Sequence, residues 1–189
     1  FVPHVPTVSR PRANVRSGFV SPDDFYRVLA AIDDQDFRDF LEWFWWTAMR
    51  PGEIASLRWA WIDQTTGTLV LHPASAKIGR SRVVPVSQPP LSEILERRKA
   101  RRRVGVPLIF HADGQPCRSR SKQGGVLDRW YDRWAKALKV AGLPASTLIY
   151  DLRRSAIRNL RQAGVAERTI MAISGHLTRG TFDRYSIQT

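Results

Sequence analysis

Cysteine is nearly absent from this chain of 189 residues, in which Cys117 is the only one. A single cysteine excludes a disulfide within the chain and any zinc site built from several thiolates, and it fits a reducing cytoplasm. The histidines also lack the spacing of metal ligands: they are His4, His72, His111 and His176. No apolar run approaches the roughly 18 residues that a membrane-spanning helix needs. The sequence therefore predicts no metal, no cofactor and no membrane span.

Acidic residues are scarce as well, because Asp and Glu total 17 against 30 Lys and Arg, which gives a net charge of +13. Such an excess indicates a polyanionic partner, usually nucleic acid, although a merely soluble basic protein would also show it. An anionic membrane surface is less favoured, since no basic amphipathic helix is set off from the rest. Two dense basic runs, at 97–103 and 118–122, fit either solvated cations or sequence-independent contacts to DNA phosphates.

The first 20 residues differ in composition from the rest of the chain. They contain Pro3, Pro6 and Pro11 together with three arginines, and proline at this density prevents a long helix or a central strand. We interpret residues 1–20 as a basic interdomain linker, and residues 21–189 as one catalytic domain. A linker at this place suggests a preceding DNA-binding domain that is absent here.

Helical periodicity dominates residues 21–189. Ser21 can cap a first helix, with Pro22 at its first position and Phe25, Val28 and Leu29 on one face. Further helices are expected at 35–48, just after Pro51, and at 91–103, 125–141, 150–163, 166–173 and 179–186. Residues 59–86 favour a small antiparallel sheet of about three strands, and residues 105–123 a loop with little strand. The fold class is therefore mainly α (α+β).

Four short segments carry residue types suited to phosphate chemistry. Arg50 stands before Pro51-Gly52-Glu53, and Lys77 opens the stretch Lys77-Ile78-Gly79-Arg80-Ser81-Arg82. The third segment is Tyr150-Asp151-Leu152-Arg153-Arg154, and the fourth is Ser174-Gly175-His176, with Tyr185 nine positions beyond the histidine. Guanidinium groups remain charged at neutral pH and can bind phosphate oxygens through two hydrogen bonds.

With these segments the sequence resembles the tyrosine recombinase family, also called the phage integrase family, from about Phe19 to Ile187. The family has an arginine after its second helix, a lysine on a β-hairpin, a His-x-x-Arg motif, a second His or Trp, and a C-terminal tyrosine. The matching residues, in the same order, are Arg50, Lys77, Arg153, His176 and Tyr185. Glu53 matches the acidic residue that usually follows the first arginine. The resemblance implies an integrase-type catalytic core.

One position departs from the family, because Tyr150 stands where the His-x-x-Arg motif would begin. A neutral tyrosine can donate one hydrogen bond to a phosphate oxygen but carries no positive charge. Its reference pKa of ~10 also makes it a poor proton shuttle near neutrality. We retain Tyr150 as a predicted site residue and expect the substitution to affect the rate of cleavage rather than the fold.

The resemblance implies a metal-independent reaction in which Tyr185 attacks a DNA phosphate, leaving a 3′-phosphotyrosyl link and a 5′-hydroxyl. Arg50 and Arg153 would clamp the phosphate, Lys77 would protonate the leaving oxygen, and His176 would hold a phosphate oxygen or assist Tyr185. The implied partner is double-stranded DNA, bound by a homotetramer of the full-length protein in the cytoplasm of a prokaryotic or phage-infected cell. The chain alone is expected to be monomeric and weakly active.

Two other functions remain open at this point. A type IB topoisomerase-like enzyme would use the same arginine, lysine and tyrosine chemistry to relax supercoils without exchanging partners. A DNA-binding module that has lost catalysis is the second, motivated by Tyr150. Each motif taken alone also has an ordinary structural explanation: Arg50 as a helix-end cation, Lys77 as a solvated loop residue, and Tyr185 as a packing aromatic.

Overall fold

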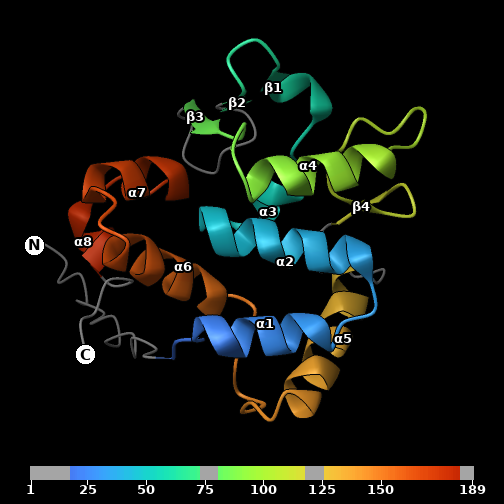
Figure 1. The fold of residues 1–189 in the computed structure, drawn as a ribbon, viewed down its shortest axis with the longest axis vertical. Coiled ribbons are helices and arrows are strands. Elements are labelled where there is room, and N and C mark those ends of the chain that lie inside the picture. The colour runs from blue at the N-terminus through green and yellow to red at the C-terminus, as the bar shows by residue number, and fades with distance from the viewer. Residues whose placement is uncertain (1–17, 73–80, 118–125, 184–189) are drawn as a thin grey trace, which may run out of the picture.

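The computed structural model describes residues 18–72, 81–117 and 126–183, and its architecture is shown in Figure 1. The helices are α1 (Pro22–Ala30), α2 (Gln35–Thr47), α3 (Pro51–Ile54), α4 (Leu91–Ala100), α5 (Val126–Val140), α6 (Asp151–Gln162), α7 (Glu167–Ser174) and α8 (Arg179–Asp183), with a 3-10 turn, η1 (Trp59–Trp61). The strands are β1 (Ile62–Asp63), β2 (Thr68–Leu71), β3 (Arg82–Pro85), β4 (His111–Ala112) and β5 (Gln115–Pro116). The expected mainly helical fold is confirmed.

The expected three-stranded antiparallel sheet is present, in the order β1-β2-β3. Its register pairs Thr68 with Pro85 and Leu71 with Arg82. A second sheet, the hairpin β4-β5, lies in the region expected to be loop. Its turn is made by Asp113 and Gly114, both with positive φ (54° and 82°), which suits the Asp-Gly preference of a tight hairpin. The expectation of a loop with little strand therefore missed one short hairpin, at residues 111–116.

The starts of α1 and α2 follow from their capping residues. The Ser21 hydroxyl accepts a hydrogen bond from the Asp24 N–H at 3.1 Å, as the sequence predicts. The Asp34 carboxylate caps α2 by accepting from the N–H groups of Asp36 (2.9 Å) and Phe37 (3.2 Å). Each cap satisfies backbone donors that have no partner within their own helix.

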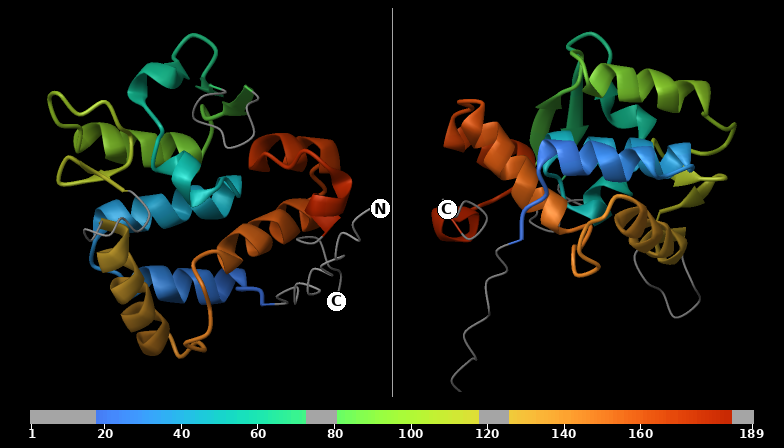
Figure 2. Two further views of the ribbon diagram at one scale, coloured as in Figure 1. Left: turned by 180° about the vertical axis from the view of Figure 1, so that it is seen from behind. Right: turned by 60° about the horizontal axis from the view of Figure 1, so that its bottom comes forward.

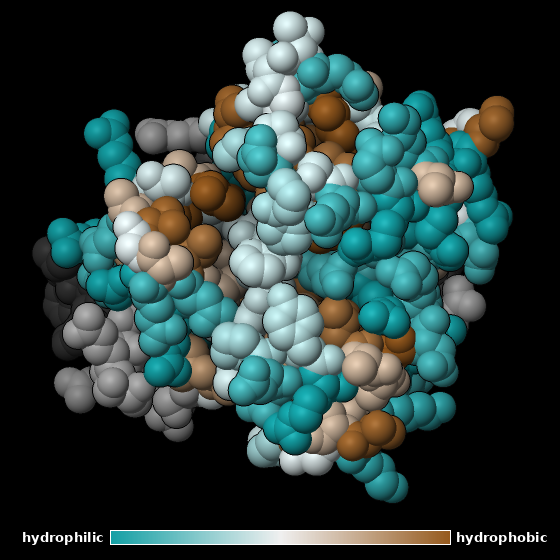
Figure 3. All heavy atoms as spheres, viewed as in Figure 1, coloured by the Kyte–Doolittle hydropathy of each residue, from teal (hydrophilic) through white to brown (hydrophobic). Residues whose placement is uncertain are grey.

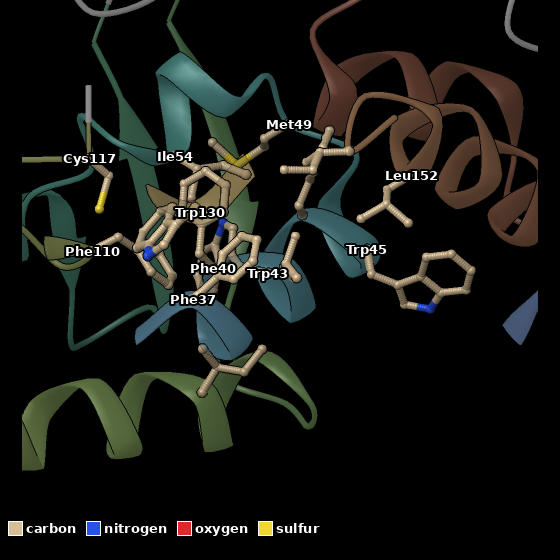
Figure 4. Close-up of a cluster of buried hydrophobic side chains, with 14 of the residues drawn as sticks. Phe37, Phe40, Trp43, Trp45, Met49, Ile54, Phe110, Cys117, Trp130 and Leu152 are labelled. Atoms are coloured by element: carbon tan, nitrogen blue, oxygen red, sulfur yellow. The ribbon is translucent and has the colours of Figure 1, made fainter. Parts of the chain in front are cut away.

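Helix α2 is the centre of the fold, with α4 on one side and α1 and α6 on the other (Figures 1 and 2). It contributes Phe37, Phe40 and Trp43 to the main core, all fully buried or nearly so, and Figure 4 shows them gathered around Trp130 of α5. The rings of Phe37 and Trp130 stack with their centroids 5.0 Å apart. The interpretation of residues 40–48 as a buried helix is confirmed for most of their length.

Arginines of the basic run 97–103 tie α4 to α2. The fully buried Arg98 forms an ion pair with Asp36 and lies 3.6 Å from the Asp39 carboxylate. It also donates to two backbone carbonyls, those of Ile109 (3.0 Å) and His111 (3.2 Å). Both interpretations of the basic run, solvated cations or contacts to DNA, are therefore wrong for Arg98, because its charge is neutralised inside the protein. The second basic run, 118–122, lies outside the described residues.

Residues 18–20 dock against α6. The N–H of Val20 donates to the Ser155 hydroxyl at 2.8 Å, and Arg154 donates to the Gly18 carbonyl at 3.2 Å. The Arg158 guanidinium lies 4.8 Å from the centre of the Phe19 ring, a distance suited to a cation–π contact. The chain therefore enters the domain along the helix that carries Arg153.

Hydrophilic side chains cover much of the face shown in Figure 3, and apolar side chains appear there in separate patches. Over the described ranges 18–72, 81–117 and 126–183, none of the helices combines the length and the apolar character needed to cross a membrane.

Candidate active site

Arg50 is placed by the sharp exit from α2. Ala48 ends that helix in the left-handed conformation (φ 49°), and Arg50 is extended (φ −69°, ψ 142°) at the cap of α3. Pro51 then begins α3, because its fixed φ suits a first helical position. The Arg50 side chain remains 23% exposed. Its Nη1 donates to the Gly175 carbonyl at 3.3 Å, so the exit from α2 is joined to the end of α7.

Glu53 connects two arginines. Its carboxylate accepts from the Arg50 backbone N–H at 2.9 Å and from Arg50 Nη1 at 3.3 Å. Arg82 of β3 donates to both carboxylate oxygens, at 2.6 and 3.3 Å. Burial alone would raise the pKa of Glu53, but hydrogen bonds and charge from Arg82 and Arg50 outweigh it and lower that pKa below its usual value. Glu53 is therefore an ionised anchor for both guanidiniums.

Arg153 lies in the first turn of α6 and is fully buried. It donates to the Ala48 carbonyl, which ends α2, and at 3.0 Å to the Ser174 carbonyl, which ends α7. Helix C-termini carry partial negative charge, so these two carbonyl groups stabilise the buried cation. The sequence predicted that Arg153 would be partly buried with an anionic partner. In the described contacts, the carbonyl ends of two helices take the place of that partner.

His176 follows directly from the end of α7. Gly175 adopts a left-handed conformation (φ 73°), and the N–H groups of Gly175 and His176 both bond the Met171 carbonyl, at 2.8 and 3.0 Å. This C-cap turns the imidazole inward, leaving His176 5% exposed. Arg153 Nη2 lies 3.2 Å from His176 Nε2. The arrangement brings His176 and Arg153 into direct contact.

The hydrogen bonds of Ser174 determine the tautomer of His176. The Ser174 hydroxyl lies 2.6 Å from the Ile170 carbonyl, which can only accept, and 2.7 Å from His176 Nδ1. A hydroxyl has one proton, so Ser174 donates to Ile170 and accepts from Nδ1–H. Burial, aided by the charges of Arg153, Arg50 and Arg82, lowers the pKa of His176 to about 3. The imidazole is therefore neutral, with Nε2 as its acceptor.

Of the three other predicted site residues, the structure describes only Tyr150. Tyr150 precedes α6 as its cap residue and is 41% exposed; its carbonyl accepts from the Arg153 N–H at 3.2 Å, so both belong to the same end of α6. Lys77 and Tyr185 lie outside the described residues. The structure thus brings Arg50, Arg153 and His176 together around the ends of α2 and α7, with Tyr150 at the adjoining end of α6.

Sequence reasoning missed two members of this cluster, Arg82 and Ser174. Arg82 had a signal, since it lies five positions after Lys77 in the same motif and begins a predicted strand. Ser174 had none, because its role depends on a histidine ring folding back over the end of α7. In the part of the chain that the structure describes, no three His, Cys, Asp or Glu side chains gather closely enough to hold a metal ion.

Comparison with known proteins now identifies the family. Residues 19–188 match the phage integrase family, and the chain belongs to it. The shufflon-specific DNA recombinase of Escherichia coli is 33% identical over 145 residues, which cover 74% of this chain and 32% of that protein. The chain thus spans about a third of the length of this curated relative.

Solved structures share the fold. A lambda integrase dimer bound to a COC′ core site superposes with a TM-score of 0.70 at 17% identity, covering 90% of this chain and 48% of that chain. XerA recombinase also gives a TM-score of 0.70, at 18% identity, covering 91% of this chain and 61% of that chain. At this level of identity the likeness concerns the fold, and the chemistry must be argued from the side chains.

Proposed function

We propose that the protein containing this chain is a site-specific DNA recombinase that cleaves and rejoins duplex DNA through Tyr185. The observation that carries the proposal is the meeting of Arg50, Arg153 and His176 around the ends of α2 and α7. Arg50 lies more than a hundred positions before Arg153 and His176 in the sequence, and the three residues match the family motifs in the same order. Family membership and the net charge of +13 support a DNA substrate.

The proposed phosphate clamp uses the two arginines differently. Arg50 is partly exposed, and the described hydrogen bonds of its side chain leave from Nη1 alone, so Nε and Nη2 can meet a phosphate. Arg153, buried behind the turn at Gly175, adds its positive charge from inside and holds His176. In a site shielded from water such fixed charges stabilise the developing charge of the transition state strongly. Losing one comparable donor costs other enzymes about 10²–10³ in rate.

The bond changes then balance without an external energy source. Tyr185 Oη attacks phosphorus, the bond to the 5′-oxygen breaks, and Lys77 supplies the proton to that oxygen. The phosphodiester becomes a 3′-phosphotyrosyl ester, which another 5′-hydroxyl can attack to restore DNA and free Tyr185. The phenol proton leaves to solvent, because the His176 ring already accepts from Arg153 at Nε2 and its pKa is lowered to about 3. His176 assists the attack by holding the Arg153 guanidinium in place. Tyr150 donates a hydrogen bond to a phosphate oxygen.

The proposal extends to the assembly and the domains. The solved relatives include a lambda integrase dimer on a core site and a tetramer on a Holliday junction, and we propose a homotetramer on DNA for the full-length protein. Residues 1–20 would serve as the linker and residues 21–189 as the catalytic domain, with the chain alone monomeric. A DNA-acting enzyme of this kind works in the cytoplasm of a prokaryotic or phage-infected cell.

A trapped covalent intermediate tests the proposal. The full-length protein would first select its site from randomised duplexes, and that site would be rebuilt as a nicked suicide duplex. We expect a protein–DNA adduct from the wild type and none from Tyr185→Phe, which keeps the ring but lacks the nucleophile. Absence of an adduct from the full-length wild type would refute the proposal. Products from supercoiled plasmids carrying two sites then distinguish recombination from relaxation alone, the activity of a topoisomerase-like enzyme.

A further inference from the structure

Arg82 is the one guanidinium of the cluster to which neither the motifs nor the proposed chemistry assigns a role. It begins β3, only 10% of its side chain is exposed, and both of its terminal nitrogens bond the Glu53 carboxylate. Glu53 is itself 3% exposed. The pair therefore joins the β-sheet to α3 inside the protein, and Arg50 bonds the same carboxylate.

Gly175 touches the same guanidinium. A Cβ built on Gly175 would collide with Nη1 of Arg82 and approach Arg50 Nη1 at 3.4 Å. Gly175 also has a positive φ of 73°, which side chains disfavour. The absence of a side chain at this position therefore lets Arg82 pack against the turn that carries His176. Three elements, β3, α3 and the end of α7, meet at one guanidinium.

Arg82 and Arg50 compete for the Glu53 carboxylate, and this competition sets the direction of the Arg50 donors. Arg82 makes the shorter bond to the carboxylate, 2.6 Å against 3.3 Å for the Arg50 side chain. Without Arg82, the buried carboxylate would take Arg50 as its full bidentate partner, since a buried charge requires pairing. The Arg50 donors that face a phosphate would then turn toward Glu53.

We propose that Arg82 is a positioning residue: by occupying Glu53 and packing on Gly175, it keeps the free donors of Arg50 directed at the DNA phosphate. This inference rests on the proposed function, because it assumes that Arg50 binds the scissile phosphate. A merely structural ion pair would affect folding alone, whereas a positioning residue affects the rate of phosphate attack in a folded, DNA-bound protein.

The functional test compares Arg82→Gln and Arg82→Lys in the full-length protein, using the suicide duplex rebuilt from its selected site. The control is Arg27→Gln on α1, an exposed arginine paired with Asp24, which removes the same charge far from the cluster. At saturating duplex we expect Arg82→Gln to slow adduct formation by about 10²-fold, the scale of a small misplacement, while duplex affinity stays near that of the control. Arg82→Lys should recover part of the rate, because it keeps the charge without the two-pronged geometry. A rate for Arg82→Gln equal to that of the control would overturn the inference.

A second test needs no DNA. Gly175→Ala is made in the wild-type background and in Arg82→Ala, and urea unfolding is measured for all four proteins. The backbone strain at Gly175 is common to both backgrounds, but the collision exists only when Arg82 is present. We therefore expect Gly175→Ala to lower the urea midpoint more in the wild-type background, and equal shifts would overturn the inference.

The two tests separate this inference from the proposed function. If the full-length wild type forms no adduct, the proposed function fails, but the unfolding comparison still tests whether Arg82 packs against Gly175. If Arg82→Gln does not fold, Arg82→Lys carries the rate comparison.

Discussion

Burial of a neutral His176 should make the fold sensitive to mild acid. The ordinary histidine pKa of 6.5 applies to the unfolded chain, whereas burial and the charge of Arg153 lower it to about 3 in the folded protein. Below pH 6.5 the unfolded chain binds a proton at His176 that the folded protein does not, so this stability is complete above pH 6.5 and lost as the pH falls. One pKa unit corresponds to 1.36 kcal/mol, so the loss at pH 5 is about 2 kcal/mol.

The assay is urea unfolding of the chain at pH 8 and pH 5, for the wild type and His176→Gln. Glutamine does not titrate, so the wild type should lose about 2 kcal/mol more than the variant between the two pH values. Replacement of the exposed His72 by Gln controls for the loss of a histidine. NMR titration of the His176 ring provides the direct measurement. A midpoint near pH 6.5 in the folded protein would refute both the burial argument and the assignment of a neutral ring.

Three further predictions concern the core, the tautomer and the departure from the family motif. Arg98→Leu removes the buried cation that bonds Asp36, while Arg101 still bonds that carboxylate at 2.8 Å. The cost in urea unfolding should therefore be about 3 kcal/mol, the lower end of the range for breaking a buried ion pair. Ser174→Ala removes the acceptor of Nδ1–H, so ¹⁵N NMR should show His176 leaving the single tautomer of the wild type while the helices persist. Tyr150→His should raise the rate of covalent adduct formation in the full-length protein by up to about 10², the lower range of general acid–base catalysis.

Each of these has an outcome that contradicts it. A cost below about 1 kcal/mol for Arg98→Leu would match an exposed ion pair rather than a buried one. An unchanged ¹⁵N spectrum in Ser174→Ala would mean that another group fixes the ring. An unchanged adduct rate in Tyr150→His would show that tyrosine serves adequately at this position.

The helices could be predicted because their information is local. Apolar spacing predicted a helix at 125–141 where α5 spans Val126–Val140, and the Ser21 cap gave the start of α1. The hairpin β4-β5 was missed because strands of two residues are too short to show alternation. Its one local signal was the pair Asp113-Gly114, which stood within a stretch rich in turn residues.

Candidate site residues could be chosen from the sequence, but the way they are held in the fold could not be predicted. Arg50, Arg153 and His176 were found from their motifs, yet nothing local indicates that Arg153 is held by the ends of two other helices. The same limit applies to Arg98, whose carboxylate partner lies 62 positions earlier in the chain. A run of arginines looks the same in sequence whether its charges face DNA or the core, because the acidic partners that decide the matter come from α2.

The way these charges are held bears on how the site would treat a phosphodiester. Arg153 is stabilised by the carbonyl ends of α2 and α7, whose partial charges hold a cation without cancelling it. Arg50 and Arg82 share a single carboxylate, that of Glu53, and His176 is neutral. Among the side chains Arg50, Arg82, Arg153 and Glu53, guanidiniums therefore outnumber carboxylates. In the proposed reaction a phosphodiester would gain a second negative charge as Tyr185 attacks. These guanidiniums would then stabilise the transition state more than the ground state, and such a difference is what accelerates a reaction.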